Sequence, residues 1–399
     1  IPDAQSWLDV TETALNNMKS LMTDVRTQCV NGSTDTMNQE DRNTILKQLK
    51  SLQSQLYAEG NADYAGRTVF TGYRTDQDLV FTENDTKTSY QIDQTFTYEG
   101  LESFRYYTGN VKVPATKDEV LNSDISDTLQ SNYYRLRTSY NKIDDMQAFS
   151  YTTKDANGQE QTMTIDLANA TDQTGTNADG SNFTYKTAAA VDAGGAAANP
   201  ARTMYVFDTE EDWAAAMGQK QVGDNDIVLI KENGNIVLGE QVSSEFRTNK
   251  ATISTTYDKT GFDKGQLRPE YYFNCINKTD ANNPISYKKY DENGKEIGYD
   301  INYTVAGNQE LTVNTEASDA FNSDIQRDID DMITSVTNAI SAHDKLTELK
   351  AMKNEAQYAE KEYQTKLDEW ITAAQKEADY ADDHLQKLFS SEIGKVDGY

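Results

Sequence analysis

The sequence predicts an α+β protein: an elongated helical rod formed by N- and C-terminal helices with a β-hairpin, plus a β-rich central insert. Three observations support this class. Both ends of the chain contain long runs free of Gly and Pro, with apolar residues at alternating spacings of three and four. The stretch GRTVFTGYRTD (66–76) combines two glycines with β-branched and aromatic residues. Three Asn-Gly pairs separate strand-like runs in the middle.

The first helix is predicted over residues 3–31, with Gly32 as its end. Its apolar residues recur in the a/d pattern of a coiled-coil seam. The seam comprises Leu8, Leu15, Met18, Met22, Val25 and Cys29, with Trp7, Ala14 and Leu21 on its flank. A second helix is expected from a capping box at Thr36 and Gln39 to a stop at Gly60. Its apolar face comprises Ile45, Leu49, Leu52 and Leu56.

The C-terminal run, residues 319–393, contains neither Gly nor Pro. It would extend ~110 Å if it were helical throughout. Because neither end of the chain can bury its apolar stripe alone, we expect the first two helices to pack along one long closing helix.

The middle of the chain reads as strands. Asn157-Gly158, Asn233-Gly234 and Asn293-Gly294 each predict a hairpin with a type I′ turn, since both residue types accept left-handed conformations. Residues 171–200 read as a loop, and TEEDWAAAM from Thr209 reads as a short helix. The predicted domains are residues 1–100 (first half of the rod with the hairpin), 101–300 (β-rich outer insert) and 301–399 (second half of the rod).

Composition limits the possible partners. Lys and Arg total 37 and Asp and Glu total 65, a net charge of −28. This charge disfavours nucleic acid and anionic membrane surfaces. The first ten residues lack the pattern of a cleaved secretory signal. Cys29 and Cys275 are too few and too far apart for a disulfide framework and are expected to be packing residues.

The sequence gives little evidence for catalytic groups. Acidic clusters occur at Asp144/Asp145, Glu210/Glu211/Asp212 and Asp330/Asp331, but solvated surface or helix-start acids explain them better than glycoside hydrolysis. The loops NADGSN and DENGKE read as turns rather than calcium sites. His343 and His384 are expected at the surface. We therefore expect no catalytic, cofactor or metal site.

The segment LMTDVRTQCVNGSTDTMNQEDRNTILKQLKSLQSQL (21–56) resembles the rod segment of the bacterial flagellin superfamily. GRTVFTGYRTD is similar to the hairpin of one branch, the hook-filament junction family of third hook-associated proteins, although Thr68 takes a place that is often aromatic there. Residues 301–321 look like that family's return strands. The residues at matching places are Arg26, Asn31, Gly32, Asp41, Arg42, Ile45, Leu49 and Leu52.

The resemblance implies a non-enzymatic structural adaptor of the extracellular flagellum, exported by the flagellar type III apparatus without a cleaved signal. Its implied partners are the first hook-associated protein, flagellin, further copies of itself and an export chaperone. Polar subunit contacts are expected at Arg26, Asp41, Arg42, Arg67 and Arg74, although ordinary solvated or intrachain pairs are an equal alternative.

Two other functions stay open. The chain could be flagellin, the filament subunit itself, although the hairpin argues against this. It could also be an extracellular glycan-binding or glycan-hydrolysing protein whose site lies in the insert. Members of the family carry further helices at both extremes, and we expect this chain to lack them and to be monomeric.

Overall fold

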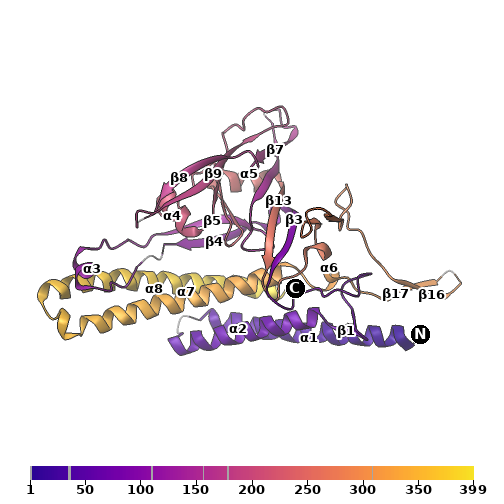
Figure 1. The fold of residues 1–399 in the computed structure, drawn as a ribbon, viewed down its shortest axis with the longest axis horizontal. Helices are drawn as coiled ribbons and strands as arrows, with labels where there is room; N and C mark the ends of the chain where they lie inside the picture. The colour runs from indigo at the N-terminus through magenta and orange to yellow at the C-terminus, as the bar shows by residue number, and fades with distance from the viewer. Residues whose placement is uncertain (1, 35–36, 109–110, 156, 178, 308) are drawn as a thin grey trace. The chain divides into compact units, whose positions relative to one another are not determined.

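N- and C-terminal helices and a β-rich central region make up the chain, which confirms the predicted α+β class (Figure 1). The computed structural model describes residues 2–34, 37–108, 111–155, 157–177, 179–307 and 309–399. The helices are α1 (Pro2–Gly32), α2 (Gln39–Gly60), α3 (Lys117–Asn122), α4 (Glu210–Ala216), α5 (Glu240–Asn249), α6 (Ala317–Ala320), α7 (Asp324–Lys353) and α8 (Lys361–Val396).

Seventeen strands are described. They are β1 (Asp63–Tyr64), β2 (Arg67–Thr68), β3 (Asp85–Thr97), β4 (Glu102–Tyr107), β5 (Gln130–Arg137), β6 (Met146–Lys154), β7 (Glu160–Asp166), β8 (Thr171–Thr176), β9 (Asn182–Val191), β10 (Thr203–Phe207), β11 (Asp226–Ile230), β12 (Asn235–Leu238), β13 (Thr252–Phe262), β14 (Asn274–Asn277), β15 (Ile285–Tyr287), β16 (Asn302–Ala306) and β17 (Gln309–Thr312).

The chain divides into two units. Unit 1 contains residues 1–21, 54–103 and 133–327, and unit 2 contains residues 22–53, 104–132 and 328–399. Helices α1, α2 and α7 contribute residues to both units. The three predicted domains stay a prediction.

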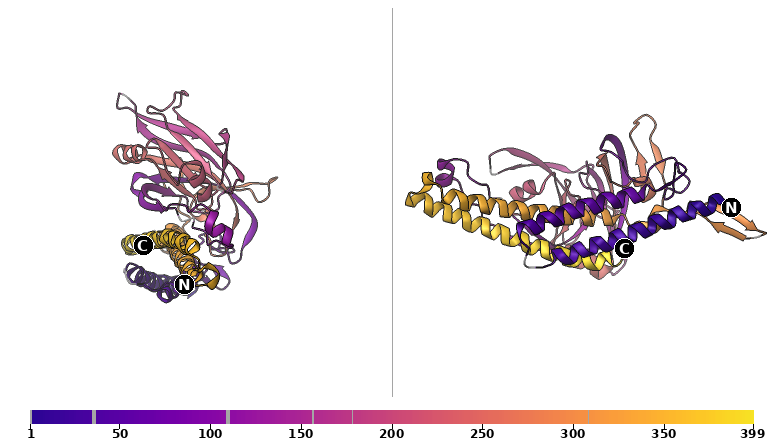
Figure 2. Two further views of the ribbon diagram at one scale, coloured as in Figure 1. Left: turned by 90° about the vertical axis from the view of Figure 1, so that its left-hand side faces the viewer. Right: turned by 90° about the horizontal axis from the view of Figure 1, so that it is seen from below.

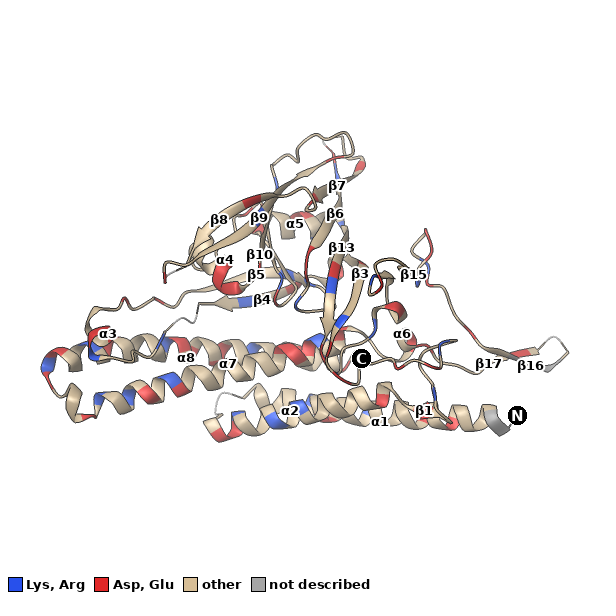
Figure 3. Ribbon diagram, viewed as in Figure 1, with Lys and Arg blue, Asp and Glu red and all other residues tan. Residues whose placement is uncertain are grey.

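In unit 2 the C-terminal run forms two helices rather than the single long helix that we predicted. α7 and α8 lie side by side and run antiparallel (Figures 1 and 2). Lys345 Nζ lies 2.8 Å from Glu377, and Lys395 Nζ lies 3.2 Å from Asp328, so the two pairs tie the helices at different heights. Figure 3 shows acidic and basic residues along both helices.

The turn between α7 and α8 needs neither Gly nor Pro. The side-chain Nε2 atom of Gln364 donates to the backbone carbonyl oxygens of Lys353, at 2.8 Å, and Tyr358, at 2.7 Å. Tyr358 is buried and its ring packs edge-on against Tyr363. A side chain thus satisfies carbonyls that the end of α7 leaves free, which is why composition gave no sign of the break.

The terminal helices pack together in unit 2, as we predicted. Arg26 Nε donates to Asp397 at 2.6 Å, and Gln53 Nε2 donates to Asp330 at 2.6 Å. A Cβ atom at Gly32 would lie 2.2 Å from the Phe389 ring, so this glycine permits a close approach that no other residue allows.

The buried seam of α1 is rotated from the predicted one. Leu8 is 39% exposed, and Leu15 and Met22 are only partly buried. The predicted seam residues Met18, Val25 and Cys29 are buried, and they are joined by Thr11, Ala14 and Gln28 in place of Leu8, Leu15 and Met22. Thr36 lies outside the described residues, and the start of α2 carries a capping box at Asn38 and Asp41, whose side chains each accept the other's backbone N–H at 3.0 Å. The predicted apolar face of α2 is buried.

A 13-stranded sheet dominates the middle of the chain. Its order is β15-β14-β3-β13-β6-β7-β9-β10-β11-β12-β5-β4, with β8 paired to β9 outside this path. The residues of β4 and β5 are divided between the two units. The β10–β11 pair is parallel.

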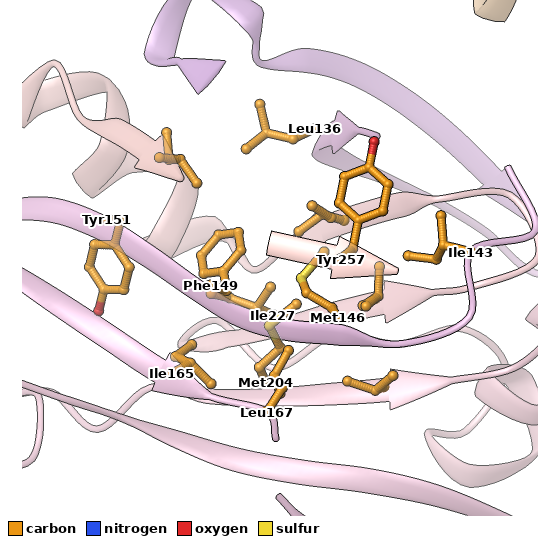
Figure 4. Packing of buried hydrophobic residues seen from close by; sticks show 14 of the residues in the cluster. Leu136, Ile143, Met146, Phe149, Tyr151, Ile165, Leu167, Met204, Ile227 and Tyr257 are labelled. Atoms are coloured by element: carbon orange, nitrogen blue, oxygen red, sulfur yellow. The ribbon is translucent and has the colours of Figure 1, made fainter. Parts of the chain in front are cut away.

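The core of unit 1 is apolar and lies on this sheet. Phe149 and Tyr151 from β6 and Ile165 from β7 belong to one buried cluster with Met204 from β10 and Ile227 from β11 (Figure 4). This packing is the main hydrophobic contribution to the fold of unit 1.

Local predictions in the insert have mixed outcomes. Asn157-Gly158 and Asn233-Gly234 do lie in hairpins, β6–β7 and β11–β12, whereas Asn293-Gly294 lies in a turn closed by one isolated bridge. The type I′ assignment is wrong at the second and third pairs, because Gly234 and Gly294 have positive φ and the preceding asparagines do not. The helix from Thr209 is confirmed as α4, with the Thr209 hydroxyl accepting from the Asp212 amide.

The predicted loop at residues 171–200 is wrong. This segment forms β8 and β9, and β9 pairs with β7, β8 and β10. Its threonines and alanines carry little apolar surface, so the neighbouring strands rather than its own composition place it in the sheet.

Candidate functional site

The segment that follows α2 folds back as a hairpin. β1 and β2 pair antiparallel, with Tyr64 opposite Arg67. Ala65 and Gly66 between them have φ of 53° and 78°, as a type I′ turn requires. The structure therefore has a hairpin at residues 63–68, with its turn at Ala65 and Gly66, and the hairpin that we predicted within residues 66–76 is wrong. Residues 69–77 form further turns instead of a returning strand.

Hydrogen bonds close these turns. The Thr68 amide donates to the Thr75 carbonyl at 2.9 Å, and the Val69 amide donates to the Ala62 carbonyl at 3.0 Å. The Thr68 hydroxyl donates to the Gln77 carbonyl at 2.8 Å. The backbone of residues 68–77 is thereby held at both ends, and Thr68, where the resembling family often has an aromatic residue, supplies two of the bonds.

The apolar residues of the segment anchor it. Val69 and Phe70 are buried, and burial of a side chain of this size contributes about 1.5–3 kcal/mol. Gly72 has φ of 59°, a conformation that favours glycine. Just after it, Tyr73 is 61% exposed, so the anchored turn presents an aromatic ring to the surface.

Arg74 crosses from this turn to the strands of the sheet. Its guanidinium carbon lies 4.0 Å from the ring centre of Tyr287 and 5.8 Å from that of Tyr271. Its Nη1 atom lies 4.0 Å from the Glu270 carboxylate, whose side chain is 1% exposed. Burial and then the negative charge of Glu270 raise the pKa of the Tyr271 hydroxyl. The result is a cation held by two aromatic rings in front of a buried acid.

A second buried cation lies beside it. Lys289 is 2% exposed, and its Nζ atom lies 2.5 Å from Glu316 and 2.7 Å from Glu296. Burial lowers the pKa of Lys289, but the hydrogen bonds and charges of the two carboxylates outweigh burial, so its pKa is raised overall. Glu316 also accepts the backbone N–H of Tyr299. This cluster ties residues 289, 299 and 316 together.

These groups line one pocket of about 120 Å³, which we call the hairpin pocket. Its lining includes Phe70, Arg74, Glu270, Tyr271, Tyr287 and Tyr299. The Tyr73 ring packs edge-on against Tyr299. The pocket is thus a concave, partly charged site bordered by exposed aromatic rings, which is the form that a recognition site takes.

The five predicted contact residues lie in different surroundings. Arg74 lines the hairpin pocket and Arg67 is exposed on β2, so one short segment carries both. Arg26 forms the exposed pair with Asp397, and Asp41 caps α2. Arg42, whose side chain is 6% exposed, donates to Asp382 at 2.7 Å. Whether any of them contacts another subunit stays a prediction.

Sequence reasoning missed most of the hairpin pocket. Glu270, Tyr287 and Lys289 lie about 200 residues after Arg74 and share no periodic pattern with it. The one available signal was the aromatic-rich segment RPEYYF (268–273), in which a single acid stands among rings.

The acidic clusters take structural positions. Asp145 lies near Lys186 and Lys231, Glu210 pairs with Lys220 at 2.5 Å, and Asp330 accepts from Gln53. No group of three or more His, Cys, Asp or Glu side chains in the described ranges is placed to hold a metal ion. Within the same ranges, no helix has the length and apolar character needed to cross a membrane.

One prediction about titratable groups is wrong. His384 is buried rather than exposed, and its ring packs edge-on against Phe104 within unit 2. Both cysteines are buried, and burial is the main cause that raises the pKa of Cys29 to about 12. Thiols with raised pKa values are poor nucleophiles, which agrees with a packing role.

Comparison with known proteins extends these observations. Residues 2–75 match the model of the bacterial flagellin N-terminal helical region, which confirms the predicted resemblance over this part of the chain. FlgL of Xanthomonas campestris in space group H3 aligns at 8% identity over 99% of this chain and 89% of that chain, with a TM-score of 0.24. The flagellar junction protein FlgL from Legionella pneumophila aligns at 9% identity over 99% of this chain and 93% of that chain, with a TM-score of 0.22. No curated protein sequence matches the chain.

Proposed function

We propose that the chain is a non-enzymatic structural subunit of the bacterial flagellum that joins the hook to the flagellin filament. The observation that carries this proposal is the flagellin-type N-terminal helical region at residues 2–75, whose helices are closed by the chain's own last helices. The GRTVFTGYRTD segment favours the junction subunit over flagellin, because its sequence is the part of the resemblance that separates the two.

In the proposed mechanism, neighbouring subunits pack through their surfaces and catalyse no reaction. In unit 2, charged pairs and a close glycine contact fix the register of four helical segments, so each copy presents the same stiff surface. Many copies that bind side by side through modest interfaces gain strength from their number. Among the five proposed contact residues, Arg67 is exposed, whereas Arg42 is buried against Asp382.

We propose the first hook-associated protein, flagellin and further copies of this chain as partners in the assembled flagellum. An export chaperone would hold the chain before its transport by the type III apparatus. The β-rich insert would face outward, and the chain would be monomeric until it assembles.

Deletion of the gene, followed by electron microscopy and analysis of the medium, tests the proposal. We expect hooks without filaments and flagellin released into the medium, with recovery when the gene is restored. Normal filaments would overturn the flagellar function. Bare hooks with no flagellin in the medium would instead identify the chain as the filament subunit.

A cavity in the insert supports a second candidate function, glycan binding. It measures about 300 Å³ and is lined by Tyr151, Asp155, Asn199, Arg202 and Glu245. Arg202 is 4% exposed, pairs with Glu245 at 2.6 Å and has a buried Nε atom without a hydrogen-bond partner. A glycan array with the full chain tests this function. Signal that disappears in Arg202→Ala, while the variant keeps its circular dichroism spectrum, would favour it over a purely structural insert.

A further inference from the structure

The hairpin pocket contains hydrogen-bonding groups that the described part of the chain does not satisfy. Arg74 Nη1, Glu270 Oε2 and the Tyr271 hydroxyl are each buried and without a hydrogen-bond partner. All three residues line the same pocket. Glu270 is more than nine-tenths buried, and leaving a buried polar group unpaired costs about 1–3 kcal/mol or more. The pocket therefore favours a guest that satisfies these atoms.

The three atoms specify the chemistry of that guest. A carboxylate oxygen needs a donor, a guanidinium nitrogen needs an acceptor, and a phenol hydroxyl takes either role. A guest that carries both a donor and an acceptor on one small group satisfies all three. A primary carboxamide has this composition, with an NH₂ donor and a C=O acceptor.

Charge disfavours ionic guests. Three cations, Arg74, Lys288 and Lys289, line the pocket, and of its two carboxylates Glu316 is already paired with Lys289. A further ammonium or guanidinium group would meet like charge. A guest carboxylate would face Glu270 and offer it no donor. A neutral amide carries neither penalty.

The rim of the pocket is suited to a protein partner. Tyr73 is exposed, yet its hydroxyl donates to the Asp300 carbonyl and its ring packs against Tyr299. The Tyr299 hydroxyl donates to the Lys288 carbonyl at 2.5 Å. Ile285 is 53% exposed and lies two positions before Tyr287 on β15, on the same face. Aromatic rings that are fixed before binding lose little entropy when they are covered.

We propose that the hairpin pocket binds the carboxamide of an Asn or Gln side chain from a second copy of this chain. The choice of a second copy rests on the proposed function, in which copies pack side by side. The fixed tyrosine rim then receives the neighbouring backbone, and the amide enters beside Arg74, Glu270 and Tyr271.

Saturation-transfer NMR on the full chain tests the chemistry, with acetamide, acetate and methylammonium as probes. We expect transfer to the acetamide methyl group and little to the other two. Tyr271→Phe removes one hydroxyl and should weaken acetamide binding by about 2- to 10-fold. Tyr272→Phe is the matched control, because its hydroxyl is also buried and unpaired but does not line the pocket. Equal or stronger transfer to acetate or methylammonium, no transfer to acetamide, or equal loss in both variants would overturn the inference.

The same two variants test the second copy. In a strain that lacks the gene, Tyr271→Phe should restore fewer filaments than Tyr272→Phe. Equal restoration would show that the guest does not come from a neighbouring copy in the assembly. Failure of the proposed function is seen separately, because filaments would then persist in the deletion strain without any variant.

Discussion

Unit 1 contains two lysines that are each 2% exposed, and their surroundings could hardly differ more. Lys259 lies on β13, where its Nζ donates to the Lys142 carbonyl at 3.4 Å and lies 5.1 Å from the Phe262 ring centre. Lys289 lies at the hairpin pocket and contacts two carboxylates. Burial lowers the pKa of Lys259 to about 8, whereas the pKa of Lys289 is raised.

The difference between the two lysines shows where a buried charge stabilises the fold and where it does not. Around Lys259 burial outweighs the more distant acids, so the ammonium is a cost that the rest of the sheet offsets. Around Lys289 the carboxylates of Glu296 and Glu316 outweigh burial, so the ammonium joins segments that share no regular structure. Burial of a charge alone therefore does not mark a site, but a buried charge with complete partners shows where loops are held in place.

Removal of Lys289 should have the largest effect. Lys289→Met leaves the buried Glu316 without its cation, which we expect to lower the free energy of unfolding by about 3–5 kcal/mol at pH 7. Urea unfolding measures this loss. Lys288→Met is the control, since Lys288 is exposed and should change stability by less than about 0.5 kcal/mol. Similar losses in both variants would contradict the role that we give to the buried pair.

Removal of Lys259 should have the opposite effect and raise the free energy of unfolding. The folded-state pKa of about 8 lies below the ordinary value of 10.5, so the unfolded chain binds more protons between these values and stability rises with pH there. At pH 7, Lys259→Met should therefore stabilise the protein by about 3 kcal/mol.

The pH dependence distinguishes this cause from better packing. The advantage of Lys259→Met should shrink from pH 8 to pH 10.5, as the wild-type lysine loses its proton in the fold. Urea unfolding of both proteins over this range measures it. An advantage that stays constant with pH would be evidence for packing alone.

A smaller effect is expected at Glu296. Burial raises the pKa of this carboxyl, but hydrogen bonds from Lys289 and Ser318 outweigh burial, so the pKa is lowered overall. Its contribution is present above the ordinary value of 4.5 and is lost as pH falls through the lower folded value. Because its side chain is 41% exposed, we expect Glu296→Gln to cost less than about 1 kcal/mol at pH 7 and nothing in acid. Unfolding curves at both pH values check this.

The smallest effect is expected at Arg26, whose partner Asp397 is as exposed as itself. The side-chain hydrogen bond and the charge of Asp397 raise the pKa of Arg26, but solvent and salt screen such a pair. The urea midpoint of Arg26→Ala should match that of wild type within measurement error. A clear drop would mean that this pair holds the ends of unit 2 together.

Sequence patterns predicted the elements whose signal is local. The Gly32 and Gly60 stops, α2, α4 and two Asn-Gly hairpins follow from residues that are neighbours in the chain. The rotated seam of α1 shows the limit, because Thr11 and Gln28 are buried while Leu8 is exposed. Which face of a helix is buried depends on its partners as well as on its own apolar residues.

Features that depend on distant contacts could not be predicted. The break between α7 and α8 rests on the Gln364 amide, and β9 is held by the strands around it. Of the hairpin pocket, only Arg74 and the adjacent turn were accessible to sequence reasoning. Glu270 and Lys289 reach it through the topology of the sheet, which no short motif encodes.

The Arg26–Asp397 contact joins residues 371 positions apart, and the Gln53–Asp330 contact joins residues 277 positions apart. A ribosome must therefore reach α8 before unit 2 can close, and closing so long a loop is slow. Throughout synthesis the first helices lack their partners. The residues of unit 2 that precede α8 therefore stay without their α8 partners until α8 is made.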